Sequence, residues 1–124
     1  MKCEVGDIVL VNNFIYPDGR EGSLHSFVVM GTNMDEFEIV NLDYLCFLIS
    51  SKEGKTNDVN PSYPYNEPIL PTPDNGLKKR SHVKCDFLYD KIKEDDIFMR
   101  IGTVTPKQWE RFATLYQQSL KEIN

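Results

Sequence analysis

The chain has 124 residues, of which 40% are hydrophobic and 11% aromatic, and its formal net charge is −5. This length and composition predict one globular domain over residues 1–124 and exclude a disordered chain. The acidic balance argues against a generic nucleic-acid coat protein, whose surface would be broadly basic. The apolar run YLCFLI is too short to cross a bilayer, and MKCEVGDIVL lacks the apolar core of a signal peptide. We therefore expect a cytoplasmic protein that does not enter membranes.

The first part of the chain predicts strands. The segment VGDIVLV (5–11) enters from a Gly-Asp turn and continues as a β-branched apolar run, which is typical of a strand. Residues 12–23 contain Pro-Asp-Gly and a second glycine, and they predict a polar loop. Three further strands are predicted at 25–31, 37–42 and 44–50. The last of these is apolar almost throughout, which favours a central position in a sheet.

Residues 51–80 differ in character from the segments before them. They contain five prolines, which exclude a helix and confine any strand to the edge of a sheet. We therefore expect a long Pro-rich loop, either functional or mobile. Two more strands are predicted after it, at 82–92 and 95–104. Alternation in the first of these places four side chains on one face: Val83, Cys85, Phe87 and Tyr89.

The last segment predicts an α-helix. Thr105 can cap it, Pro106 occupies its first position, and Gln108 completes a T-x-x-Q capping box. Apolar side chains then follow one stripe at helical spacing: Trp109, Phe112, Ala113, Tyr116, Leu120 and Ile123. Short strands followed by one helix predict a mainly β protein, with a small, strongly curved antiparallel sheet or barrel and a C-terminal helix.

The cysteines and histidines give no sign of a metal site. Cys3, Cys46 and Cys85 are odd in number and have no CxxC spacing, so we expect reduced thiols, with Cys46 as a small core residue. The two histidines lie far apart in the sequence and form no local pair of ligands with the cysteines. We expect neither a metal nor another cofactor.

Polar residues that can support phosphate chemistry gather at three places. His25 and Ser26 precede an apolar strand, and Ser50 and Ser51 end another. The basic stretch LKKRSHVK (77–84) and the lysines near Ser51 supply cations, which include Lys52, Lys55, Lys79, Arg80 and His82. Strand ends of a small barrel can converge on one rim. They would bring together a base for the 2′-hydroxyl of RNA and donors for the phosphorane oxygens.

Each of these residues also has a structural interpretation, and the sequence leaves both open. His25 can hydrogen-bond a loop at a strand entry, and His82 can be a plain strand residue. Ser50 and Ser51 can end a strand by bonding back to the backbone. The basic stretch can be a solvated loop. Tyr63 and Tyr65 can stack on bases or fill the Pro-rich loop, and we favour the second interpretation.

The order of several motifs resembles the PemK/MazF toxins. GDIVLV, an apolar FVVM strand and a strand ending in ISS come first, and HVKCDFLYDKIKEDDIFMRIGTVTPKQWERF is similar to the closing segment of that family. The resemblance covers roughly residues 5–50 and 82–120. It implies an SH3-like barrel, a homodimer, and a metal-independent ribonuclease that cuts single-stranded RNA rather than DNA. It also implies a cognate antitoxin as inhibitor.

The resemblance assigns roles to particular residues. The family keeps a catalytic arginine in an Arg-Pro pair, and here His25-Ser26 occupies that position. An imidazole exchanges protons more readily than a guanidinium near neutral pH, so His25 can be the acid–base residue. Ser50 or Ser51 matches the hydroxyl that ends a later strand of the family, and Arg20 is a candidate for the missing cation.

Two functions follow from these observations. The first is a sequence-specific endoribonuclease toxin that works by 2′-hydroxyl attack, with His25, Ser26, Ser50 and Ser51 as catalytic residues. Its substrate-binding residues would be Arg20, Lys52, Lys55, Lys79, Arg80 and His82. The second is a catalytically inactive barrel of the same type that binds protein or RNA, which the acidic net charge and the missing arginine favour. RNA cleavage by the purified protein separates the two.

Overall fold

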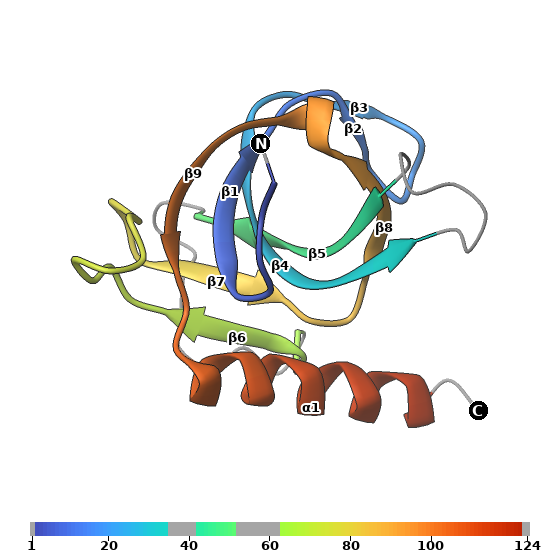
Figure 1. The fold of residues 1–124 in the computed structure, drawn as a ribbon. Coiled ribbons are helices and arrows are strands. Elements are labelled where there is room, and N and C mark those ends of the chain that lie inside the picture. Colours follow the sequence, from blue (N-terminus) through green and yellow to red (C-terminus); the bar gives the residue numbers. More distant parts are fainter. Residues whose placement is uncertain (1, 35–41, 52–62, 123–124) are drawn as a thin grey trace.

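The computed structural model describes residues 2–34, 42–51 and 63–122. In these ranges the protein is mainly β, with antiparallel strand pairing and a C-terminal helix (Figure 1). The elements in chain order are β1 (Asp7–Val11), β2 (Phe14–Ile15), β3 (Glu21–Gly22), β4 (His25–Met34), β5 (Leu42–Ser50), β6 (Asn66–Ile69), β7 (Ser81–Lys84), β8 (Tyr89–Lys93), the 3₁₀ turn η1 (Glu94–Asp96), β9 (Ile97–Thr103) and α1 (Pro106–Glu122).

The main sheet curves strongly and has β5 near its centre (Figure 1). Its described strands follow the order β6-β7-β5-β4-β1-β9, and β8 pairs with a second stretch of β5. The pairing of β4 with β5 extends from Ser26 opposite Ile49 to Met34 opposite Leu42. The two short strands β2 and β3 form a separate hairpin. This arrangement places the beginning of β4 beside the end of β5.

Alternation along the strands divides the core into two clusters. Successive side chains of a strand point to opposite faces, so neighbours such as Ile8 and Val9 are buried in different clusters. Val9 and Phe27 belong to the cluster that also contains residues of β5 and β8, such as Tyr44 and Tyr89. Ile8, with Phe47, belongs to the cluster that α1 covers. The burial of both faces explains why residues 27–30 of β4 and most of β5 are apolar.

The helix begins as the capping box predicts. The Gln108 N–H donates to Thr105 Oγ1 at 3.1 Å, and the Thr105 N–H donates to Gln108 Oε1 at 2.9 Å. The predicted apolar stripe is only partly right, because Leu120 is 40% exposed. The residues of α1 that are buried are Phe112, Leu115 and Ser119, and Trp109, Ala113 and Tyr116 pack beside them. The prediction for Ile123 lies outside the described residues.

Three of the predicted segments differ from the structure. The expected strand 82–92 is two strands, β7 and β8, because the chain turns at Cys85 and Asp86. The expected loop 12–23 contains the short hairpin β2–β3. The Pro-rich segment contains the edge strand β6, with Pro68 inside it, and its residues 52–62 lie outside the described residues. Most of the strand predicted at 37–42 also lies outside them, and Leu42 begins β5.

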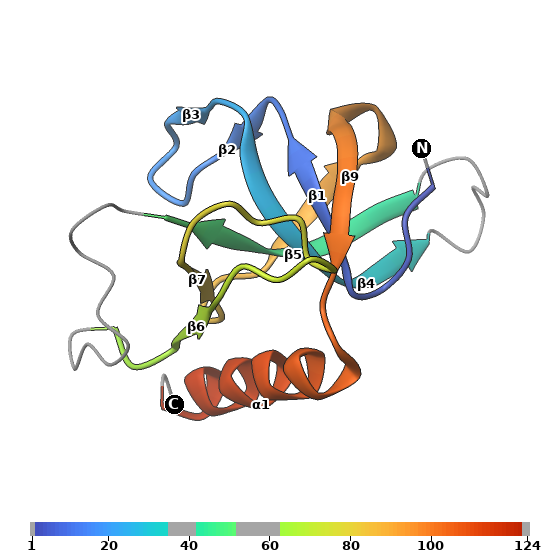
Figure 2. The ribbon, with the colours of Figure 1, turned by 90° about the vertical axis from the view of Figure 1, so that its left-hand side faces the viewer.

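The loop between β6 and β7 reaches across to β9 (Figure 2). The Thr103 N–H donates to the Asp74 carbonyl at 2.9 Å. Within the loop, the buried Asn75 side chain accepts from the Thr72 and Leu77 N–H groups and donates to the Leu70 carbonyl. These bonds hold the loop that carries part of the basic stretch against the end of β9.

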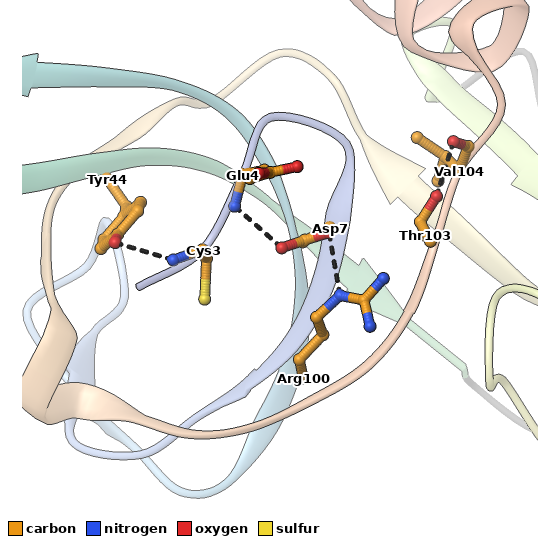
Figure 3. Close-up of polar contacts among 7 residues, drawn as sticks. All are labelled: Cys3, Glu4, Asp7, Tyr44, Arg100, Thr103 and Val104. Carbon is orange, nitrogen blue, oxygen red and sulfur yellow. Dashed lines mark hydrogen bonds and ion pairs between the residues drawn. The ribbon is translucent and has the colours of Figure 1, made fainter. Parts of the chain in front are cut away.

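The N-terminal residues are tied to the sheet by polar contacts (Figure 3). The Cys3 N–H donates to Tyr44 Oη at 3.0 Å. The buried Asp7 accepts from the Glu4 N–H at 2.8 Å and from Arg100 Nε of β9 at 3.0 Å. Cys3, Cys46 and Cys85 are all buried thiols, which confirms the core position predicted for Cys46.

Candidate functional site

A cleft lies between the β2–β3 loop, the end of β5 and the turn that follows β7. Its volume is about 750 Å³. Aromatic rings, hydroxyl groups and charged groups share its walls, and we name it the aromatic cleft. Its lining residues are Tyr16, Pro17, Asp18, Arg20, His25, Leu48, Ser50, Ser51, Tyr63, Asn66, Lys84, Asp86, Phe87 and Tyr89.

A second cleft, of about 560 Å³, shares His25 and Ser51 with the first. We name it the lysine cleft, because Lys78 and Lys79 stand on its wall above a mostly aliphatic lining. Its lining residues are Leu10, Leu24, His25, Ser26, Ile49, Ser51, Gly76, Leu77, Lys78, Lys79, Ser81, Met99 and Ile101. His25 and Ser51 therefore stand where the two clefts meet.

The structure brings all four residues predicted as catalytic to these clefts. His25, Ser50 and Ser51 line the aromatic cleft, and Ser26 lines the lysine cleft. The pairing of β1 with β4 and of β4 with β5 explains this proximity, since it sets Ser26 opposite Ile49, the residue before Ser50. His25 and Ser26 are neighbours on a strand, so their side chains point to opposite faces.

Only some of the residues predicted to bind substrate line the two clefts. Arg20 lines the aromatic cleft and Lys79 the lysine cleft. Arg80 and His82 line neither of these two clefts. Arg80 is exposed ahead of β7, and His82 is a half-buried residue of β7 opposite Ser50 and Pro68. The predictions for Lys52 and Lys55 lie outside the described residues.

His25 is half-buried at the first position of β4. Its ring meets the Phe14 ring edge to face, with 6.1 Å between the centroids. Burial lowers the pKa of His25 below its ordinary value of 6.5, and the nearby positive charge of Lys84 lowers it further. A hydrogen bond with the Ile49 backbone opposes this shift. The imidazole is therefore neutral at pH 7 and can accept a proton.

The β2–β3 loop brings Arg20 to the aromatic cleft. The loop turns through Gly19, whose φ of +88° favours glycine, and the Tyr16 N–H donates to the Arg20 carbonyl at 2.8 Å. The Arg20 guanidinium lies 5.2 Å from the centre of the Tyr16 ring and pairs with Asp18 at 2.6 Å. Hydrogen bonds from the Arg20 backbone and side chain lower the pKa of Asp18. The loop thus presents a cation beside an aromatic ring.

The sequence analysis missed Tyr16, Phe87 and Tyr89 of the cleft, whereas it named Tyr63 as a residue that could stack on bases. Phe87 is 41% exposed and meets Tyr89 edge to face at 4.8 Å between centroids, and Tyr63 is 59% exposed. Burial raises the pKa of Tyr89 to about 12, so its phenol stays protonated. The analysis assigned Phe87 to the face of a continuous strand. The clustering of aromatic residues close to the basic stretch was the available signal.

Tyr65 shows why the two tyrosines of the Pro-rich segment differ. Tyr63 lines the aromatic cleft, whereas Tyr65 packs against the core cluster beneath α1. The preference for a loop-filling role therefore fits Tyr65, and Tyr63 is available to a ligand.

Comparison with known proteins adds no identification. No protein-family model and no curated protein matches this chain. Among the described residues, no group of three or more His, Cys, Asp or Glu side chains is arranged to hold a metal ion. Within the same ranges, no helix is both long and apolar enough to span a membrane.

Proposed function

We propose that this protein is a sequence-specific endoribonuclease of the PemK/MazF type that cuts single-stranded RNA. The observation that carries the proposal is the neutral, half-buried imidazole of His25 in a cleft that also contains serine hydroxyls and cations. A neutral imidazole can act as a general base near pH 7, and hydroxyl donors and cations stabilise a pentavalent phosphate.

The proposed reaction uses the substrate's own 2′-hydroxyl as nucleophile. His25 removes the proton from the 2′-oxygen, which attacks the adjacent phosphorus and forms the P–O2′ bond. The P–O5′ bond breaks, and the leaving 5′-oxygen takes a proton from the Lys84 ammonium, which lines the same cleft. The products are a 2′,3′-cyclic phosphate and a 5′-hydroxyl end. Because the nucleophile is the substrate's own 2′-hydroxyl, the proposed reaction needs no metal ion.

The other residues of the clefts hold the phosphate in this proposal. The hydroxyls of Ser50 and Ser51 donate to its non-bridging oxygens, and Arg20 balances the charge that develops there. Ser26 and Lys79 face the lysine cleft and guide the backbone away from the reacting group. The two clefts together accommodate an unpaired strand that passes over His25.

The proposal includes an SH3-like barrel of the PemK/MazF type. The mainly β architecture with antiparallel pairing and a C-terminal helix is the part of this expectation that the fold shows. We include a homodimer and inhibition by a cognate antitoxin in the proposal. Light scattering of the purified protein tests the dimer. Recovery of RNA cleavage on removal of a co-expressed partner tests the antitoxin.

The decisive experiment is cleavage of a long single-stranded RNA in EDTA. We expect discrete cuts that leave 2′,3′-cyclic phosphates, and a loss of about 100-fold or more in rate for His25→Ala, the usual size of a general-base contribution. The matched control is His82→Ala, which removes the histidine outside both clefts and should cut normally. The melting temperature of His25→Ala should stay close to that of the wild type.

A binding module is the second candidate, and one observation favours it. The His25 imidazole already has a hydrogen bond with the Ile49 backbone. Such a bond is typical of a residue that holds the start of a strand in place and takes no part in catalysis. Intact RNA after incubation with the folded wild type would select this candidate. Cleavage that persists in His25→Ala would instead remove His25 from the mechanism and retain the nuclease.

A further inference from the structure

The aromatic cleft contains groups that phosphate chemistry does not require. Phe87 and Tyr63 line it, and these two residues are 41% and 59% exposed to solvent. Tyr16 adds a third ring, which already carries the Arg20 guanidinium over its face. Exposed aromatic rings next to cations are the usual platform for unpaired bases, since every base has a face that can stack.

The lysine cleft has a different chemistry. Apart from the shared His25, its described lining has no aromatic ring and consists of aliphatic and small polar residues with Lys78 and Lys79. Such a surface can hold a phosphate but cannot stack a base. An RNA strand that passes over His25 would therefore place a base in the aromatic cleft and its sugar-phosphate backbone along the lysines of the lysine cleft.

A carboxylate beside a stacking ring can distinguish between bases. Asp86, in the turn after β7, and Phe87, directly after it, are both exposed and both line the aromatic cleft. An ionised carboxylate only accepts hydrogen bonds. Adenine, cytosine and guanine carry an exocyclic amino group that can donate to it, whereas uracil has no amino group and can donate only through its ring N3–H.

We propose that the aromatic cleft is a base-selecting subsite: Phe87 stacks one unpaired base, and Asp86 accepts a hydrogen bond from the exocyclic amino group of that base. This inference rests on the proposed function for its setting, since it places the base next to the phosphate that His25 would attack. It extends that function by naming the class of base that the site prefers.

The test measures binding without cleavage. Short fluorescein-labelled oligonucleotides of 2′-deoxyadenosine and of 2′-deoxynebularine differ only in the exocyclic amino group, and neither has the 2′-hydroxyl needed for cutting. We expect the adenine oligomer to bind about tenfold more tightly by fluorescence polarisation, the lower end of what one good base contact contributes.

Two variants separate the contribution of the Asp86 carboxylate to binding from that of the Phe87 ring. Asp86→Asn should bring the two affinities to within about twofold, because the amide supplies a donor as well as an acceptor. Phe87→Leu should weaken both oligomers by about tenfold and leave their ratio unchanged, because it removes stacking alone. The controls are Asp95→Asn and Phe98→Leu, exposed residues that line neither cleft. All four positions are exposed, so thermal unfolding should report folded proteins.

The outcomes separate this inference from the proposed function. Equal binding of the two oligomers by the wild type, or binding of neither, overturns the subsite even if RNA is cleaved. A preference that survives Asp86→Asn overturns the role of Asp86. A preference that depends on Asp86 supports the subsite even in a protein that cuts no RNA, in which case only the catalytic proposal fails.

Discussion

His25 is a half-buried residue at the junction of two clefts. It begins β4, contacts Phe14 and stands where the aromatic and lysine clefts meet. Partial burial disfavours its charged form, and so does Lys84. In the proposed nuclease, a neutral imidazole at this position acts by proton transfer rather than by charge stabilisation.

The lowered pKa of His25 also predicts how stability depends on pH. In the unfolded chain this imidazole titrates near its ordinary value of 6.5, and in the folded protein it titrates lower. As the pH falls through 6.5, the unfolded state takes up the proton first, so the free energy of unfolding should decrease. The decrease should end once the pH passes the folded-state pKa. Urea titrations between pH 8 and pH 5 would measure it.

One variant isolates the contribution of His25 to that pH dependence. His25→Gln should flatten the decrease that the wild type shows. A stability that is independent of pH in the wild type, or equal pH dependence in the wild type and His25→Gln, would contradict the assignment.

At the scale of elements, the β6–β7 loop and β9 determine the shape of the lysine cleft. Gly76 and Ile101 both line that cleft, and the loop backbone packs against the end of β9. The loop and β9 approach each other closely at Gly102, where a Cβ would overlap the Asn75 backbone carbonyl. Gly76 has a φ of +68° and lies against the Ile101 carbonyl, so it is restricted in both conformation and space.

Gly102→Ala should therefore destabilise the protein by about 3 kcal/mol, because the loop or the strand must shift to admit a methyl group. Denaturant unfolding followed by tryptophan fluorescence measures it through Trp109. Gly31→Ala is the matched control on β4, where a Cβ would meet Leu45 at 3.4 Å, and it should change stability by less than about 1 kcal/mol. Equal effects of the two changes would mean that the loop does not pack as described.

At the scale of the whole molecule, the distribution of charge is more informative than its sum. The net charge is −5, yet Arg20 and Lys84 line the aromatic cleft and Lys78 and Lys79 line the lysine cleft. An acidic protein with local cations can bind a polyanion at one place and repel it elsewhere. The proposed RNA path follows these cations.

Salt dependence would show whether those cations contact phosphates. Binding of a non-cleavable single-stranded oligomer should weaken as salt rises, and Lys84→Gln should reduce the slope of log K against log salt by about 0.7, the value for one phosphate on a single strand. Lys107→Gln, an exposed change in the first turn of α1, should leave the slope unchanged. Identical slopes for the three proteins would remove Lys84 from the binding site.

Much of the architecture follows from local patterns in the sequence. Apolar runs predict β1, β4, β5 and β9, and a capping box with a proline predicts the start of α1. Prolines limit the 51–80 segment to an edge strand, which is the position of β6. These features depend on residues that are close in the chain, so spacing alone reveals them. The end of β7 was missed because the turn at Asp86 has neither glycine nor proline to mark it.

The site depends on contacts between distant segments, and for this reason the sequence determined only part of it. Residue types with useful chemistry, such as His25 and Ser50, could be named from the sequence. The residues that lie beside them in the fold could not. Strand pairing decided that Lys84 and Phe87 would join them, while Arg80 and His82 would line neither cleft. Pairing register and the curvature of the sheet result from packing over the whole core, which no short stretch of sequence encodes.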